Sequence, residues 1–157
     1  MFHIVLFHPE IPHNTGAAGR LAVATDSRLH LIKPLGFSLD EKHVRRTGLD
    51  YWQYVDLQLW DSLEGLEAAA APGARFWYLS TKASHNIWNP ALPLQDGDYF
   101  VFGPESRGLP ERWIAAHPET ALRIPMPGGR ARSLNLSTSV AIMLYEGLRR
   151  TLPAGQL

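Results

Sequence analysis

The sequence predicts an α/β protein in which one parallel β-sheet is flanked by helices, and three observations lead to this class. Short apolar runs alternate along the chain with longer segments of helical pattern, as in folds built from strand–helix–strand units. A chain of 157 residues suits a single domain over 1–157, since this length buries roughly 68–70% of its unfolded surface in one core. Apolar residues make up 45% of the chain and charged residues 19%, so it can fill that core and lacks the charge excess of disordered proteins.

The strands and helices can be assigned in order. Strands are predicted near residues 2–7, 28–33, 52–57, 75–80, 98–103 and 121–125. Helices are predicted over residues 14–24, 62–71, 110–116 and about 133–150. In the first helix Asn14 or Thr15 can cap free backbone N–H groups, and Asp26 closes the segment. Pro72 and Gly73 end the second.

The last helix has the clearest pattern. Its apolar positions recur every four residues, at Leu136, Val140, Leu144 and Leu148. The stripe could cover the sheet, join a partner subunit, or do both, and periodicity does not choose among these.

Charge and cysteine content narrow the function. Fifteen Lys and Arg balance fifteen Asp and Glu, so nucleic-acid binding would depend on a local basic patch. The absence of cysteine removes disulfides, thiolate nucleophiles and Cys-type zinc sites, and makes a reducing cytoplasm the expected compartment. Residues 1–8 lack the basic start and the apolar length of a signal peptide or membrane span, so no membrane association is expected.

Several catalytic motifs are missing. The chain has no Walker-type phosphate loop and no Gly-x-Gly-x-x-Gly turn, which argues against ATPases and ordinary dinucleotide enzymes. Its seven histidines form no His-Glu-x-x-His pattern, and no metal is expected. Gly-x-Ser-x-Gly is also absent, which argues against an α/β-hydrolase.

Three loops remain as candidates, and each follows a predicted strand. They are 79–82, 103–108, and 124–129 leading into 133–137. Each loop alone is most simply a tight turn. Open α/β sheets bind ligands beyond the carboxyl ends of their strands, however, and the glycines of 103–108 allow a ligand to approach the main chain. Together the loops predict a binding site.

Four ordered motifs resemble those of a known family. They are Asn14-Thr15-Gly16-x-x-x-Arg20, Phe102-Gly103-Pro104-Glu105-x-x-Gly108, Ile124-Pro125-Met126 and Ser133-x-Asn135-x-Ser137. Over nearly the whole chain they resemble the motifs of the SpoU branch of the SPOUT methyltransferases. The chain lacks the extra RNA-binding segments of many members, and it is similar to the minimal bacterial type that methylates the ribose of tRNA wobble nucleotide 34.

The resemblance implies the fold, cofactor and partners. It implies a C-terminal trefoil knot, a homodimer with RNA lying across its interface, and S-adenosylmethionine as cofactor. The implied substrate is a tRNA anticodon stem-loop of the tRNA(Leu) type, with cytidine or a modified uridine at position 34. The implied cofactor contacts are Leu79, Thr81, Gly103, Glu105, Gly108, Ile124, Met126 and Ser133.

The same resemblance implies four catalytic residues: Arg20, Asn14, Ser133 and Asn135. A guanidinium keeps its proton at neutral pH, so Arg20 is expected to hold the ribose 2′-oxygen or a phosphate and not to remove a proton. On spacing alone Arg20 would be an ordinary surface arginine. Asn14 is expected to orient Arg20 or the nucleotide, Asn135 to cap the last helix while facing the site, and Glu105 to tie loops together or pair with an arginine.

Basic residues near the loops are candidates for RNA contact, although solvated surfaces also carry such charges. The set comprises Arg20, Lys33, Arg45, Arg46, Lys82 and Arg107, with Arg130 and Arg132 as further candidates. His13 is the one titratable alternative as a base.

Two other functions stay open from the sequence. One keeps the enzyme class and changes the substrate to ribosomal RNA or another tRNA position. The other is a non-catalytic RNA-binding module with the same fold.

Overall fold

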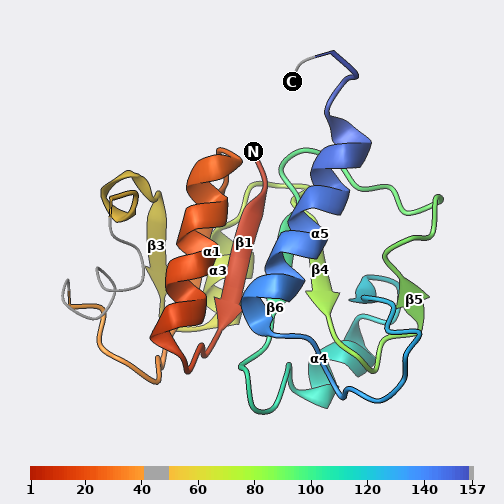
Figure 1. Ribbon diagram of the computed structural model, residues 1–157, viewed down its shortest axis with the longest axis horizontal. Helices are drawn as coiled ribbons and strands as arrows, with labels where there is room; N and C mark the ends of the chain where they lie inside the picture. The colour runs from red at the N-terminus through yellow and green to blue at the C-terminus, as the bar shows by residue number, and fades with distance from the viewer. Residues whose placement is uncertain (41–49, 156–157) are drawn as a thin grey trace.

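The computed structural model describes residues 1–40 and 50–155, and its centre is one seven-stranded sheet (Figure 1). The strand order is β3-β2-β1-β6-β4-β7-β5, and every described pairing is parallel. The strands are β1 (His3–Phe7), β2 (Arg28–Ile32), β3 (Leu57–Trp60), β4 (Phe76–Leu79), β5 (His85–Asn86), β6 (Tyr99–Phe102) and β7 (Ala121–Arg123). The predicted class of helix-flanked parallel sheet is confirmed.

Two helices, α1 (Pro12–Ala24) and α5 (Leu136–Thr151), lie side by side on one face of the sheet (Figure 1). The core beneath them includes Ile4, Phe100 and Val140, all inaccessible to solvent. Three members of the predicted stripe on the last helix, Leu136, Val140 and Leu144, are buried in this core, while Leu148 is only partly buried. The stripe therefore covers the sheet.

The other face is covered by α3 (Leu63–Ala69) and α4 (Glu111–Ala116). Its core joins Leu63 and Trp113 to side chains of the sheet such as Tyr78. Ser62 begins α3 by accepting a hydrogen bond from the Gly65 N–H at 3.0 Å. Apolar residues on both sides of the central strands explain why these strands read as continuous apolar runs.

The predicted strand over 52–57 is wrong. Residues Trp52–Tyr54 form a short 3₁₀ helix, η1, and the strand begins only at Leu57. The reason is a close contact with α1, because a Cβ added at Gly19 would lie 2.6 Å from the Trp52 ring. Trp52 and Val55 both pack against Gly19 of this helix, so the apolar pattern of the segment does not report strand pairing. The two-residue strand β5 was not predicted.

Two helix starts also differ from expectation. Helix α1 begins at Pro12, so Asn14 and Thr15 lie inside its first turn and neither caps it. Pro12 takes the first helical position, where a missing N–H costs nothing. Helix α5 begins at Leu136 and not near Ser133, and the expectation that Asn135 caps it is confirmed by a 3.2 Å hydrogen bond from the Thr138 N–H.

The register brings the candidate loops to one edge of the sheet. Leu6 is paired with Phe102, and Leu79 is paired with both Phe102 and Leu122. The segments that follow β1, β6, β4 and β7 therefore leave the sheet next to one another. Across residues 1–40 and 50–155, no helix has the length and apolar character needed to cross a membrane.

Candidate active site

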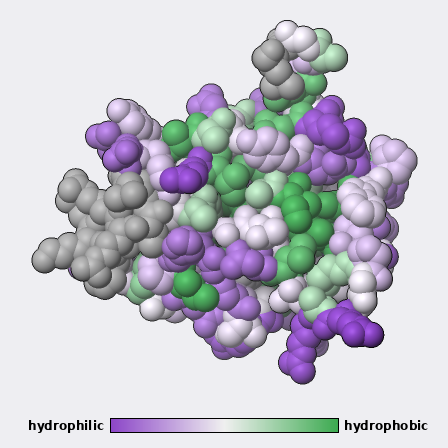
Figure 2. Space-filling view, in the orientation of Figure 1, coloured by the Kyte–Doolittle hydropathy of each residue, from purple (hydrophilic) through white to green (hydrophobic). Residues whose placement is uncertain are grey.

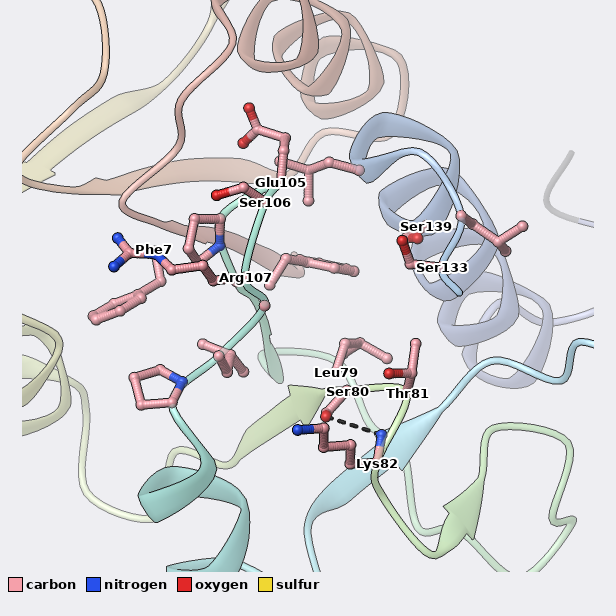
Figure 3. Close-up of a pocket in the computed structure, with 18 of the residues that line it drawn as sticks. Phe7, Leu79, Ser80, Thr81, Lys82, Glu105, Ser106, Arg107, Ser133 and Ser139 are labelled. Atoms are coloured by element: carbon pink, nitrogen blue, oxygen red, sulfur yellow. Dashed lines mark hydrogen bonds between the residues drawn. The ribbon is translucent and has the colours of Figure 1, made fainter. Parts of the chain in front are cut away.

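A cavity of about 1190 Å³ lies at this carboxyl edge, and the three predicted loops surround it (Figure 3). Figure 3 shows Arg107 and Ser133 on opposite sides of it, with Leu79 and Lys82 below. All eight predicted cofactor contacts line the cavity: Leu79, Thr81, Gly103, Glu105, Gly108, Ile124, Met126 and Ser133. The structure thus brings the set together, while its part in holding a cofactor stays a prediction.

The 103–108 loop is built so tightly that glycine is required at its first position. A Cβ added at Gly103 would lie 2.1 Å from the Leu109 backbone nitrogen and 2.2 Å from the Gly108 carbonyl carbon. Gly108 has a φ of 69°, in the left-handed region that glycine adopts at little cost. Its N–H donates to the Pro104 carbonyl at 2.8 Å. The loop therefore forms a compact wall of the cavity.

Glu105 joins this wall to the start of α1. Its carboxylate accepts hydrogen bonds from the backbone N–H groups of Glu10, at 3.0 and 3.1 Å, and of Ile11. Ile11 is the N-cap residue of α1 and offers no side-chain cap, so the carboxylate supplies partners that helix starts need. The expectation that Glu105 ties loops together is confirmed.

Asn14 and Asn135 meet at the cavity wall. The Asn135 side-chain amide donates to the Asn14 side-chain oxygen at 3.2 Å, and both residues line the cavity. The Asn135 oxygen is already occupied, because it accepts from Ser137 Oγ at 2.6 Å and from the Thr138 N–H. The Asn135 side chain therefore faces Asn14 with its NH₂ group, and this group is the donor of the bond between them. Asn14 is 3% exposed, and its own amide N–H groups are left for a ligand.

Arg20 lies away from these loops. It is exposed on α1 and does not line the cavity. Its guanidinium lies over the Tyr51 ring, 4.8 Å from the ring centroid. Within one chain, then, the structure separates the predicted catalytic arginine from Asn14, Ser133 and Asn135, which line the cavity together.

Four basic side chains, Lys82, Arg107, Arg112 and Arg132, line the cavity. Lys82 forms an ion pair with Glu111. Lys33 lies elsewhere, beside a smaller hollow of about 550 Å³, and forms a 2.9 Å ion pair with Asp61. Of the remaining predicted RNA contacts, Arg45 and Arg46 fall outside the described residues, and Arg130 does not line the cavity.

The family model for the SpoU rRNA methylase family matches residues 1–145. The chain belongs to this family. A tRNA (cytidine(34)-2'-O)-methyltransferase from Methylovorus glucosotrophus is 50% identical over 151 residues, which are 96% of each chain. A protein of the same name from Aeromonas hydrophila is 45% identical and covers 100% of this chain and 99% of its own. The predicted resemblance to the SpoU branch is confirmed.

Solved structures agree with this assignment. One, described as giving structural insights into the 2-OH methylation of C/U34 on tRNA, superposes with a TM-score of 0.88. It is 46% identical and covers 96% of this chain and 95% of its own. The match extends over nearly the whole of both chains, so the SpoU assignment applies to the sheet and the cavity alike.

In this SpoU methylase, the cavity residues outside the predicted set include His8, Ile11 and Arg112. His8 follows β1 and has a φ of 50°, which an L residue rarely adopts. Burial and the nearby Arg107 lower the pKa of His8. Its position at the carboxyl end of a strand was the signal that could have found it. His13, the alternative base, is exposed and does not line the cavity.

No group of three or more His, Asp and Glu side chains that could hold a metal ion occurs in the part of the chain that the structure describes.

Proposed function

We propose that this chain is a tRNA 2′-O-methyltransferase that uses S-adenosylmethionine and acts on the ribose of nucleotide 34. The observation that carries the proposal is the cavity in which all the predicted cofactor contacts of the SpoU motifs meet. The target is cytidine or a modified uridine in tRNA(Leu)-type anticodons. The enzyme works in the cytoplasm, which agrees with a chain that has no cysteine.

The cavity residues fit the cofactor. Leu79, Ile124 and Met126 supply apolar surface for a purine ring, and the backbone around Gly103 supplies hydrogen-bonding groups. Bound there, S-adenosylmethionine provides an electrophilic methyl group. Ser133, exposed on the opposite wall, offers a hydroxyl to the polar end of the cofactor.

Asn14 is proposed to hold the ribose. Its oxygen is occupied by the Asn135 amide, so the N–H groups of Asn14 are the part available to a substrate. An N–H donor facing the 2′-oxygen stabilises negative charge that develops there as the proton leaves. The two residues therefore have distinct roles, because Asn14 contacts the substrate and Asn135 orients the Asn14 side chain.

Arg20 is proposed to act across a homodimer interface. The exposed face of α1 and α5 carries Tyr145, 52% exposed, and the partly buried Leu21, Ile142 and Leu148. Figure 2 shows hydrophobic side chains gathered in the middle of this face of the molecule. A second copy bound there would cover apolar surface and could place its Arg20 at the first copy's cavity, where the guanidinium would hold the 2′-oxygen or a phosphate.

We further propose that residues 1–157 form one domain whose C-terminal part is threaded into a trefoil knot. In support, β7 lies between β4 and β5, so residues 80–84 connect strands on opposite sides of a strand that comes later in the chain. Stretching single molecules from their termini tests this. A knotted chain stops short of its full contour length, and a chain that reaches it is unknotted.

Methyl transfer tests the function. The purified protein is incubated with labelled S-adenosylmethionine and tRNA from a strain lacking the enzyme, and the product is mapped by mass spectrometry. The proposal expects one 2′-O-methyl group on nucleotide 34, and none on tRNA that already carries it. Methylation of ribosomal RNA or of another tRNA position would show that the enzyme class is right and the proposed substrate is wrong. Failure to bind the cofactor by calorimetry would favour a non-catalytic RNA-binding module.

A further inference from the structure

Glu10 lies outside the cavity, yet it is bonded to the cavity wall. One carboxylate oxygen accepts hydrogen bonds from the Ser106 backbone N–H at 2.9 Å and from Ser106 Oγ at 2.7 Å, and the second oxygen lies 3.0 Å from the same hydroxyl. Ser106 lines the cavity, whereas Glu10 does not. Glu10 belongs to none of the four sequence motifs.

The contact is one half of a reciprocal pair. Glu105, the neighbour of Ser106, accepts from the Glu10 backbone N–H, while the Glu10 side chain accepts from Ser106. The two loops that exchange these carboxylates follow adjacent strands, since β1 pairs with β6. The pair therefore fixes the 103–108 loop against the start of α1 from both directions.

Ser106 depends on this contact. In the part of the chain that the structure describes, Glu10 is the partner of both the Ser106 N–H and its hydroxyl. The hydrogen bonds from Ser106 lower the pKa of Glu10, so the carboxylate is ionised at neutral pH. Hydrogen bonds to an ionised acceptor are roughly twice as strong as neutral ones.

We propose that Glu10 is a positioning residue for methyl transfer: through Ser106 it holds the 103–108 wall in its binding geometry before the cofactor arrives. This inference rests on the proposed function and extends it to a residue outside the cavity. A wall that is already ordered loses less conformational entropy when a ligand binds. Arg107 follows Ser106 directly and lines the cavity, so an ordered Ser106 also restricts the chain that carries Arg107.

Three variants test the role: Glu10→Ala, Ser106→Ala and the double variant. Glu119→Ala is the control, because Glu119 is an exposed carboxylate that does not line the cavity and whose described ion-pair partner is His85 at 3.8 Å. Calorimetry with S-adenosylmethionine gives Kd, steady-state assays with tRNA give KM and kcat, and amide hydrogen exchange follows residues 105–108.

The proposal expects Glu10→Ala to weaken cofactor binding about tenfold and to raise KM for the cofactor equally, with kcat within about twofold of wild type. Ser106→Ala should weaken binding less, because its backbone N–H can still donate to Glu10. The double variant should be no worse than Glu10→Ala, because Glu10→Ala already removes the described partner of the Ser106 hydroxyl. Exchange of the amides of residues 105–108 should accelerate about tenfold without cofactor. Glu119→Ala should match wild type in all three measurements.

Other results would overturn the role. Unchanged Kd and exchange in Glu10→Ala would show that the wall is held by other contacts. Additive losses in the double variant would show that Glu10 and Ser106 act separately. The wild-type protein separates these results from failure of the proposed function: if wild type itself neither binds S-adenosylmethionine nor methylates tRNA, the function fails, whatever the variants do.

Discussion

The side-chain amide of Asn135 donates a 3.2 Å hydrogen bond to the side-chain oxygen of Asn14, and this contact joins the start of α5 to the first turn of α1. The same Asn135 oxygen caps α5. One residue therefore stabilises a helix and orients a cavity residue, and the two effects can be separated by substitution.

Asn135→Asp should separate them. The aspartate keeps an oxygen for the Thr138 N–H, so the helix cap survives, but it cannot donate to Asn14. We expect the free energy of unfolding to stay within about 0.5 kcal/mol of wild type while kcat/KM falls at least about tenfold. Asn135→Ala, which also loses the cap, should cost about 1 kcal/mol of stability in addition. Equal activity of Asn135→Asp and wild type would refute the orienting role; urea unfolding and methyl-transfer assays measure both quantities.

Mixed dimers test whether Arg20 acts across an interface. Arg20→Ala and Asn14→Ala should each lose nearly all activity as homodimers. Unfolded together in equal amounts and refolded, they should recover about a quarter of the wild-type sites, because half the dimers are mixed and each mixed dimer has one intact site. If Arg20 served its own chain, mixing would restore nothing. Sedimentation of each variant confirms that the dimers form.

The buried histidines should make stability depend on pH. Trp60 donates to His30 Nδ1 at 2.9 Å, so His30 carries its proton on Nε2 and donates to His3 at 2.8 Å. This chain requires both rings to be neutral. Burial, followed by nearby Arg28, lowers the pKa of His3 from 6.5 to about 4, and burial, followed by His3, lowers that of His30 to about 3.

The sign follows from proton uptake. Below pH 6.5 the two histidines become protonated in the unfolded chain but stay neutral in the folded protein. Their contribution to the free energy of unfolding is therefore full above pH 6.5 and is lost as the pH falls toward 4 for His3 and toward 3 for His30. For His30 the loss should be about 2 kcal/mol between roughly pH 7 and 5. Urea unfolding over this range should show a shallower decline for His30→Gln than for wild type, and no change of slope for the exposed His13→Gln. Parallel slopes for His30→Gln and wild type would contradict the assignment.

Gly103→Ala should break the cavity wall. Its Cβ would meet backbone atoms at 2.1 and 2.2 Å, and these cannot move aside as a flexible side chain would. We expect about 3 kcal/mol of lost stability and at least about tenfold weaker cofactor binding. Gly128→Ala is the control, since nothing lies within 4 Å of a Cβ there. Calorimetry and urea unfolding of both variants make the comparison, and a Gly103→Ala protein that behaves like the control would disprove the packing argument.

The sequence allowed the sheet, most of its strands and three of the loops of the cavity to be predicted, because these depend on apolar runs and on glycine and proline at strand ends. The prediction of a strand over 52–57 was wrong because the apolar Trp52 packs against Gly19 of α1 and not within the sheet. Strand β5 is only two residues long and carries His85 and Asn86, so it has no apolar run to detect.

The candidate site shows the same division. Leu79, Gly103 and Ile124 sit in loops whose place follows from strand order, and all three line the cavity. Glu10 could not be selected from the sequence, because its importance comes from a hydrogen bond to Ser106, 96 residues away. The sequence also could not show that Arg20 does not line the cavity, since this depends on how α1 is oriented on the sheet.

The contact between Arg20 and Tyr51 has a consequence for the entropy of binding RNA. An arginine side chain carries about 2 kcal/mol of rotamer entropy, part of which is lost whenever the side chain is immobilised on a ligand. The Tyr51 ring, anchored by a 3.0 Å hydrogen bond from its hydroxyl to the Gly16 carbonyl, already restricts the guanidinium at 4.8 Å. In the role proposed for Arg20, its side chain would lose less rotamer entropy on binding a phosphate or the 2′-oxygen, because Tyr51 already restricts it.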